Sequence, residues 1–246
     1  MTWEDSLESS RRDLIVIIPV YNEEGSIEKV INTWTTHLKR IGMNFEIDAY
    51  NDGSVDKTQE ILDNLKKNIS CLSVHSKSNS GHGPTILKGY QENCSRAEWI
   101  LQIDSDDEMG AEHFENLWHL RDRYQFILGQ RRGRESLPLR RFVSFCSRIV
   151  VHSFYGTGIH DVNSPYRLMK TACFQPCFFS IPKLTFAPNL IVSGYAALKK
   201  LNCCEIAVPH RNRFTGTGSL RNIKLFKGII KSFIQTVCYR FFHYPG

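Results

Sequence analysis

The chain has 246 residues, of which 41% are hydrophobic and 23% are charged. This length and composition suit one folded domain, with room for a short appendage. No window holds 18 uncharged apolar residues, so no membrane-spanning helix is predicted, and residues 1–13 lack the apolar core of a signal peptide. The eight cysteines form no C-x-x-C pair, which argues against a zinc site and favours reduced thiols in a cytosolic protein.

The net charge of +6 is unevenly distributed along the chain. Residues 1–120 carry 11 Lys or Arg and 21 Asp or Glu, whereas residues 121–246 carry 20 and 4. A strongly basic half implies an anionic partner, which could be nucleic acid, an anionic membrane surface or a phosphorylated substrate.

Apolar runs alternate with amphipathic segments in the first half of the chain. The runs predict buried strands and the segments predict helices, at 14–18, 23–40, 45–50, 55–67, 71–75, 83–94 and 99–103 in turn. This alternation predicts a mainly parallel sheet flanked by helices. The second half is less regular, with a strand at 126–129, a basic loop at 131–141, a helix at 140–155, mixed short elements over 158–213 and an amphipathic helix at 223–242.

Polar segments follow each of the four predicted strands of the first half, at 22–24, 51–54, 79–83 and 104–107. The carboxyl ends of parallel strands share one edge of a sheet, and ligands bind beyond that edge. Four such placements predict a binding site more strongly than any one motif does.

Asp104 and Asp106 directly follow the fourth predicted strand. Two carboxylates one residue apart at a strand end can reach a hard cation and the diphosphate that the cation bridges. Asp107 and Glu108 extend the cluster, and like charges this close favour cation binding. The alternative is a solvated acidic turn, but in this setting the pattern predicts binding of Mg²⁺ or Mn²⁺.

The segment Asp52-Gly53-Ser54 lies between a predicted strand and a predicted helix. It is typical of a helix N-cap with a turn glycine. It also places a carboxylate where it can accept a hydrogen bond from the base or ribose of a nucleotide. The residues expected to bind a nucleotide are Pro19, Tyr21, Glu23, Asp52, Ser54, Gly81 and Asp104.

As a set, these motifs resemble the ordered motifs of family 2 glycosyltransferases with the GT-A fold. The matching segments are Ile-Ile-Pro-Val-Tyr-Asn-Glu-Glu (17–24), Asn-Asp-Gly-Ser-Val-Asp-Lys-Thr (51–58), Asn-Ser-Gly-His-Gly (79–83) and Asp-Ser-Asp-Asp-Glu (104–108). The resemblance covers residues 13–110 and implies one Rossmann-like GT-A domain, expected over residues 13–222. It implies an inverting transfer of a sugar from a UDP-linked or GDP-linked donor. It further implies that Asp106 and Glu108 bind the metal and that Asp104 lies beside the donor.

Two later segments resemble those of dolichol-phosphate mannosyltransferase and bacterial polyprenyl-phosphate sugar transferases. They are Asp161-Val-Asn-Ser-Pro-Tyr-Arg167 and Val208-Pro-His-Arg-Asn-Arg213, the latter followed by Gly216 and Ser219. The chain departs from the subgroup at 164–167, where Ser-Gly-Phe-Arg is usual, at His82, where Lys is frequent, and at Glu108, where Gln is frequent.

This second resemblance implies a polyprenyl phosphate as acceptor. By it, Arg213 holds the donor diphosphate or the acceptor phosphate. The residues expected to bind phosphate groups are Arg131, Arg167, Arg213 and Ser219, and those expected to be catalytic are Asp104, Asp106 and Arg213.

Residues 185–192 contain no Asp or Glu. Family 2 enzymes that glycosylate hydroxyls generally carry a carboxylate base in this region, before the late basic motif. A hydroxyl acceptor must lose a proton, whereas a phosphate acceptor is already ionised. The missing carboxylate therefore favours a phosphate acceptor, with Asp161 or Glu205 as alternative bases.

Five arginines lie between residues 131 and 141. Guanidinium groups match phosphate oxygens bidentately and stay charged, so this loop is expected to contact phosphate or membrane, with a solvated surface as the alternative. The segment 223–246 is expected to be a basic amphipathic helix, either packed on the domain or lying among lipid headgroups. The expected location is therefore cytoplasmic, at the periphery of the membrane.

Three other functions stay open at this stage. A saccharide hydroxyl could replace the lipid phosphate as acceptor. A nucleotidyltransferase can share such a sheet and metal, but residues 19–24 are acidic where those enzymes have a glycine-rich loop with a lysine. A nucleic-acid-binding module would use the basic half, but that half shows no aromatic stacking pattern or reader motif, so no nucleic acid is expected as a partner.

Overall fold

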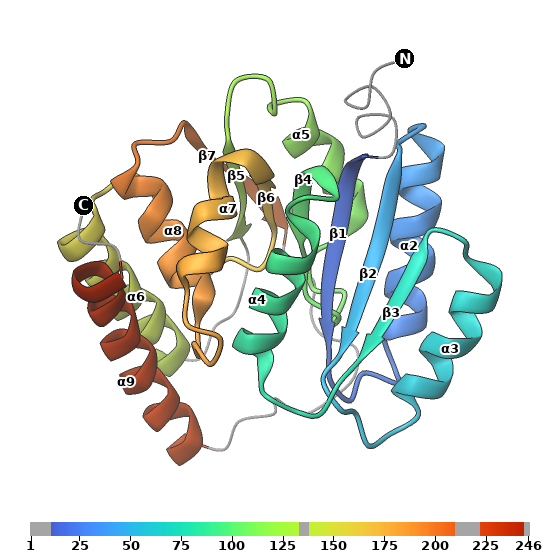
Figure 1. Cartoon of the computed structure of the whole chain (residues 1–246), viewed down its shortest axis with the longest axis horizontal. Coiled ribbons are helices and arrows are strands. Elements are labelled where there is room, and N and C mark those ends of the chain that lie inside the picture. The colour runs from blue at the N-terminus through green and yellow to red at the C-terminus, as the bar shows by residue number, and fades with distance from the viewer. Residues whose placement is uncertain (1–10, 133–137, 210–221, 244–246) are drawn as a thin grey trace.

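One seven-stranded sheet runs through the part of the chain that the computed structural model describes, which is residues 11–132, 138–209 and 222–243. The strand order is β3-β2-β1-β4-β6-β5-β7 (Figure 1). The strands are β1 (Arg12–Val20), β2 (Phe45–Asn51), β3 (Leu72–Ser76), β4 (Ala97–Gln102), β5 (Phe126–Arg132), β6 (Arg167–Lys170) and β7 (Cys203–Pro209). Only β6 runs antiparallel to its neighbours, so the carboxyl ends of the other six strands meet at one edge.

Strand β1 is buried from Leu14 to its end and is apolar on both faces. Leu14 and Val16 belong to one hydrophobic core, and Ile15 and Ile17 belong to the other. Successive side chains of a strand point to opposite faces, so a continuous apolar run, rather than an alternating one, is what a central parallel strand requires.

Helices cover both faces of this sheet (Figure 1). One core is closed by α2 (Ile27–Arg40), α3 (Thr58–Asn68), the short η1 (Ala111–His113) and α5 (Phe114–Trp118). The other is closed by α4 (His82–Asn93), α6 (Pro138–Tyr155), α7 (Thr171–Ser180), α8 (Pro188–Leu198) and the terminal pair α9 (Asn222–Cys238) and η2 (Tyr239–His243). The expected α/β architecture, with a mainly parallel sheet between helices, is confirmed.

The second half of the chain is more regular than its sequence predicts. The region 158–213, expected to be loops and short elements, contains β6, α7, α8 and β7. The basic segment 131–141 is not one loop, because Arg131 and Arg132 extend β5 and residues 138–141 begin α6. Strand β6 has only four residues, too few to show a periodic pattern, and it is defined by pairing with β4 and β5 on either side.

The terminal helix α9 packs on the domain by one side. The Tyr155 hydroxyl of α6 donates to the Thr236 carbonyl, the Gln235 side chain accepts from the amide of Phe186 at 2.8 Å, and the Tyr239 and Ser180 hydroxyls are hydrogen-bonded at 2.6 Å. No helix in the described part of the chain is both long enough and apolar enough to cross a membrane.

Helix α4 starts in close contact with the segment before α8. A methyl group placed on Gly83 would lie 2.1 Å from the Phe186 carbonyl oxygen and 2.4 Å from that of Thr185. Only glycine allows this approach. The contact ties the first turn of α4 to residues 185–186, at the edge where the strands end.

Candidate active site

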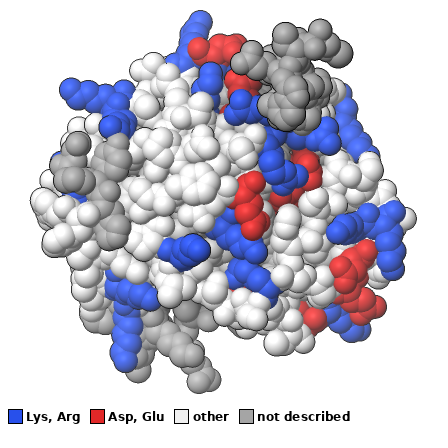
Figure 2. All heavy atoms as spheres, in the orientation of Figure 1, with Lys and Arg blue, Asp and Glu red and all other residues white. Residues whose placement is uncertain are grey.

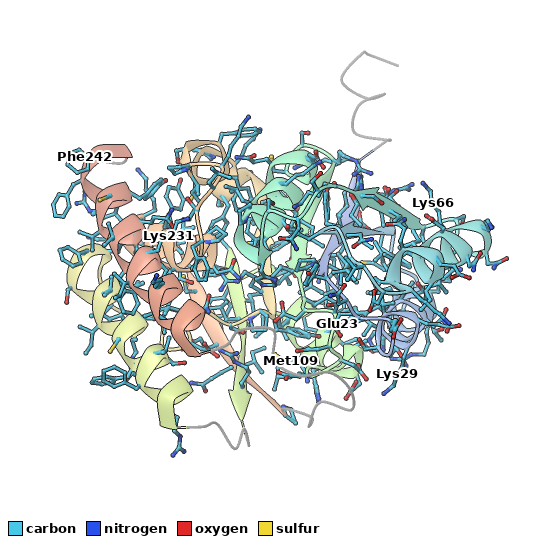
Figure 3. The ribbon with its side chains drawn as sticks, turned by 90° about the horizontal axis from the view of Figure 1, so that it is seen from below. Glu23, Lys29, Lys66, Met109, Lys231 and Phe242 are labelled. Atoms are coloured by element: carbon cyan, nitrogen blue, oxygen red, sulfur yellow. The ribbon has the colours of Figure 1, made fainter. Side chains whose placement is uncertain are left out.

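Three loops meet at the carboxyl edge of the sheet, and hydrogen bonds join them. The amide of Asn22, after β1, donates to the Ser54 hydroxyl, after β2, at 2.9 Å. The Val55 amide donates back to the Asn22 side chain at 2.9 Å. The Ser26 hydroxyl donates to the Ser105 carbonyl, after β4, at 3.0 Å. Figure 3 looks onto this edge, with Glu23 and Met109 in its central part. The polar segments predicted to share one edge do so.

The residues expected to form the nucleotide wall differ in their accessibility. Tyr21 is 40% exposed at the tip of the first loop. Glu23 is half-buried, and its carboxylate accepts from the Ser26 hydroxyl at 2.8 Å. Pro19 is buried within β1, so it supports the loop and offers little surface to a ligand. The Ser54 hydroxyl donates to Asn51 at 2.6 Å, and so fixes the turn after β2.

Asp52 holds the loop that follows β3. Its side chain is almost fully buried, and its two oxygens accept from the amides of Ser80 and Gly81, each at 2.8 Å. The ammonium of Lys77 also contacts the Asp52 carboxylate. The carboxylate therefore shapes the loop that leads into α4. The sequence analysis missed Lys77, although its place directly after β3, at the same edge, is a usable signal.

The acidic turn after β4 alternates between partly exposed and buried side chains. Asp104, Asp106 and Glu108 are partly exposed, whereas Asp107 is buried. Lys29 of α2 lies 2.7 Å from Asp107, which has a positive φ of 57°. The structure thus gives Asp107 a contact with α2, whereas Asp104, Asp106 and Glu108 remain partly accessible to solvent.

The acidic turn offers carboxylates of the kind that a divalent cation shared with a ligand uses. Among the residues described, no group of three or more His, Cys, Asp or Glu is placed to hold a metal by itself. Mg²⁺ typically takes one or two protein carboxylates and completes its shell with water and substrate phosphates. Asp106 and Glu108 are partly exposed carboxylates of one short turn, where they could serve in this way.

A buried hydrogen-bond network of side chains from β4, α4 and α8 ends at Asp104. Gln102, at the end of β4, donates to the Asp104 carboxylate at 3.2 Å. The oxygen of the Gln102 amide accepts from Asn189 at 3.0 Å and from the Tyr90 hydroxyl at 3.2 Å. These contacts fix which end of the amide faces Asp104. Sequence patterns gave no sign of this network, because its members come from β4, α4 and α8.

Arg131, at the end of β5, lies beside the acidic turn. It forms a bidentate pair with Asp161, with nitrogen–oxygen distances of 3.0 and 3.1 Å. Burial lowers the pKa of Arg131, but Asp161, Asp104 and Glu108 outweigh this effect and raise it. The guanidinium is therefore held in its charged form by Asp161, near Asp104 and Glu108. Its expected role in binding phosphate stays a prediction.

The expectation that Arg167 binds a phosphate is not supported, because its side chain is fully buried. Its guanidinium donates to the carbonyls of Ser164 and Asn189, at 2.7 to 3.2 Å, and to that of Val162 at 3.4 Å. It also lies over the ring of Phe126. Burial lowers the pKa of Arg167. Its donors join two main-chain segments, residues 162–164 and the start of α8 at Asn189, and its side chain is shielded from solvent.

The two carboxylates considered as alternative bases have partners. Asp161 is paired with Arg131, and Glu205 accepts from the amides of His160 and Asp161 at 2.7 to 3.1 Å. The imidazole of His160 also contacts Glu205, at 2.8 Å. Both carboxylates are therefore engaged in holding the loop before β6. The predicted Arg213 and Ser219 lie outside the described residues.

Comparison with known proteins agrees with this geometry. The chain matches the family described as glycosyl transferase family 2 over residues 15–178. It is 27% identical over 217 residues to undecaprenyl-phosphate 4-deoxy-4-formamido-L-arabinose transferase from Pseudomonas paraeruginosa, covering 87% of this chain and 62% of that protein. The protein of that name from Shewanella sediminis is 24% identical, with 82% and 60% covered. The chain thus spans about three fifths of these relatives' length.

Solved structures with the same fold include two bacterial enzymes. Glucosyl-3-phosphoglycerate synthase from Mycobacterium tuberculosis, in complex with phosphoglyceric acid, superposes with a TM-score of 0.64 at 17% identity, covering 96% of this chain and 83% of that one. S. aureus TarS 1–349 in complex with UDP-GlcNAc superposes with a TM-score of 0.60 at 19% identity, covering 92% and 66%. At such identities the similarity establishes the fold alone.

Proposed function

Because this chain belongs to glycosyl transferase family 2, we propose that it transfers a sugar from a nucleoside diphosphate donor to a polyprenyl phosphate. The observation that carries the proposal is the shared edge, where the 21–24 loop, Asp52 with its bound loop, and the acidic turn lie together. The two relatives reported above are named as undecaprenyl-phosphate sugar transferases, which supports a polyprenyl phosphate as acceptor.

The nucleoside would bind against Tyr21 and the loops after β2 and β3, with the diphosphate over the acidic turn. A divalent cation held by Asp106 and Glu108 would stabilise the charge on the leaving diphosphate. We take UDP as the first donor to test, because TarS was crystallised with UDP-GlcNAc and glucosyl-3-phosphoglycerate synthase with Mn²⁺ and UDP.

The charge arrangement favours an acceptor that is already ionised. Asp161 and Glu205 are both occupied by internal partners, Asp161 by Arg131 itself, and Arg131 keeps its charge within that pair beside Asp104 and Glu108. A phosphate acceptor needs an arginine and no base, whereas a hydroxyl acceptor needs a base. In the transfer, the phosphate oxygen attacks the anomeric carbon from the side opposite to the leaving diphosphate, which inverts that centre.

A donor and acceptor screen tests the proposal directly. UDP- and GDP-sugars are each incubated with undecaprenyl phosphate or with an oligosaccharide, with Mn²⁺ or with EDTA. We expect sugar on the lipid phosphate, only with metal. Transfer to the oligosaccharide alone would contradict the assignment of the acceptor. A separate incubation with a sugar phosphate and a nucleoside triphosphate that yields a nucleotide sugar and pyrophosphate would indicate a nucleotidyltransferase.

Replacing Asp52 with Ala is expected to weaken nucleotide binding more than it slows the chemical step. The loss of the carboxylate leaves the amides of Ser80 and Gly81 and the ammonium of Lys77 without their acceptor, so the loop loses its fixed shape. We expect the Kd for the nucleoside diphosphate to rise about tenfold or more, with kcat less affected. Calorimetry measures this, and an unchanged Kd would remove Asp52 from any role in the nucleotide site.

A further inference from the structure

Helices α6 and α9 are apolar on their outer sides as well as their inner sides. On α6, Ser147, Val151 and Tyr155 face the core, whereas Phe142 (63% exposed) and Phe145 (50%) face outward. A helix on the surface of a domain ordinarily carries polar residues on its outer side.

On α9 and η2, the outward residues include Ile234 (58% exposed) and Phe242 (78%). The rings of Phe154 on α6 and Phe241 on η2 lie 5.9 Å apart, so the outer stripes of the two helices meet. Exposed apolar groups that gather in this way mark an interaction surface.

The charged groups of these helices all have one sign. Neither α6, α9 nor η2 contains an Asp or Glu, and together they hold Arg140, Arg141, Arg148, Lys224, Lys227, Lys231 and Arg240. Figure 2 shows the left part of the visible surface, over α9, with basic and neutral groups and no acidic one. Arg240 donates to the Phe154 carbonyl at 3.2 Å, so one basic side chain contacts the residue whose ring meets Phe241.

This surface continues to the candidate active site through one residue. The ring of Phe186 lies against Gly228 of α9, where an added methyl would be 2.4 Å from the ring. The carbonyl of the same Phe186 lies against Gly83, in the first turn of α4. Helices α6 and α9 both start on the side of the molecule where the strands end (Figure 1). A molecule lying on the outer sides of α6 and α9 is therefore adjacent to the site edge.

We infer that the outer sides of α6, α9 and η2 form a docking face for a bilayer that contains anionic phospholipid. Aromatic and aliphatic side chains enter the boundary between headgroups and acyl chains, while lysine and arginine bind lipid phosphates. The partner of this face must offer negative charge next to apolar surface. An anionic bilayer offers both by its composition, as lipid phosphates above acyl chains, whereas a protein partner would need a matching patch. By the proposed function, a polyprenyl phosphate acceptor would lie in this same bilayer. Vesicle binding can nevertheless be measured without donor or acceptor, so it is tested separately from sugar transfer.

Co-sedimentation with vesicles tests the charge contribution. Vesicles of phosphatidylcholine alone are compared with vesicles containing 30% phosphatidylglycerol. The variant Lys227→Gln with Lys231→Gln is compared with Lys66→Gln and Lys67→Gln on α3, at the opposite end of the molecule (Figure 3). We expect the α9 pair to weaken partitioning into the anionic vesicles about 30-fold, which is about 5-fold for each lysine. Equal effects of the two pairs, or no binding by the unaltered chain at low salt, would overturn the inference.

The apolar contribution is tested with the variant Phe142→Ser, Phe145→Ser and Ile149→Ser. The control for vesicle binding alone is Val55→Ser, an exposed apolar side chain (84%) on the loop before α3, away from α6 and α9. We expect the triple variant to lose vesicle binding while its thermal unfolding and nucleoside diphosphate binding stay unchanged. If instead the unaltered chain forms a dimer in sedimentation velocity, ignores vesicles, and becomes monomeric in the triple variant, the face is a contact between copies and the inference is wrong. Vesicle binding without any sugar transfer would keep this inference and reject the proposed function.

Discussion

Replacing Asp106 with Ala should abolish sugar transfer while the fold remains intact. Asp106 is a partly exposed carboxylate in the turn after β4, and the amide of Glu108 donates to it at 3.2 Å. A cation held by Asp106, as proposed, would stabilise the leaving diphosphate mainly in the transition state, so removing the Asp106 carboxylate should lower kcat/KM by about 10³-fold or more. Transfer to undecaprenyl phosphate at saturating Mn²⁺ measures the effect.

Asp122→Ala is the control for this prediction. Asp122 is exposed and lies in the segment between α5 and β5, so its removal should change neither activity nor stability measurably. Near-normal turnover of the Asp106 variant in saturating Mn²⁺ would contradict a role in metal binding. Loss of thermal stability in the same variant would instead show that the carboxylate supports the turn.

Arg167→Met should have the largest effect on stability. The substitution removes donors to the carbonyls of Ser164, Asn189 and Val162, all inside the core. Buried carbonyls without partners are costly, so we expect the free energy of unfolding to fall by about 3 kcal/mol. Urea unfolding followed by circular dichroism measures it.

The exposed Arg123→Met serves as the comparison for Arg167 and should leave the unfolding curve unchanged. The two explanations of Arg167 give opposite results. If the variant is as stable as the unaltered chain but has lost affinity for the acceptor, Arg167 contacts phosphate. If it is unstable, and the folded fraction retains acceptor affinity, the residue has a structural role.

The parallel half of the sheet could be predicted from sequence because its signals are local. Continuous apolar runs such as Leu14–Val20 and the helical spacing of Ile27, Val30 and Ile31 reflect burial within a single element. The polar segments that end the strands were therefore placed on the correct edge. Helix boundaries shifted, as at α2, which starts at Ile27 rather than residue 23, because residues 22–24 are held by the loop after β2.

The contacts that define the site could not be predicted, since they depend on the third dimension. Arg167 stands in a segment that resembles a phosphate-binding motif, yet a short antiparallel strand carries it into the core. Gln102 and Asn189 are far apart in sequence and meet only because α8 packs against α4, so that Asn189 in its first turn reaches the end of β4. The basic composition of the second half indicated an anionic partner, but only the packing of α6 against α9 showed which side chains stay exposed.

The position of β6 in the sheet affects how the chain folds as it leaves the ribosome. Strands β1 to β4 and their helices are contiguous in sequence, so this half can form as soon as Gln102 and its flanking residues have emerged. The free side of β4 then waits for Arg167–Lys170, which are made only after β5 and α6. During that interval β4 offers an open row of amides and carbonyls, bordered by buried-type side chains such as Trp99 and Ile100. A chain that ends before β6 leaves this side of β4 unpaired, and an unpaired strand edge is where chains pair with one another and aggregate.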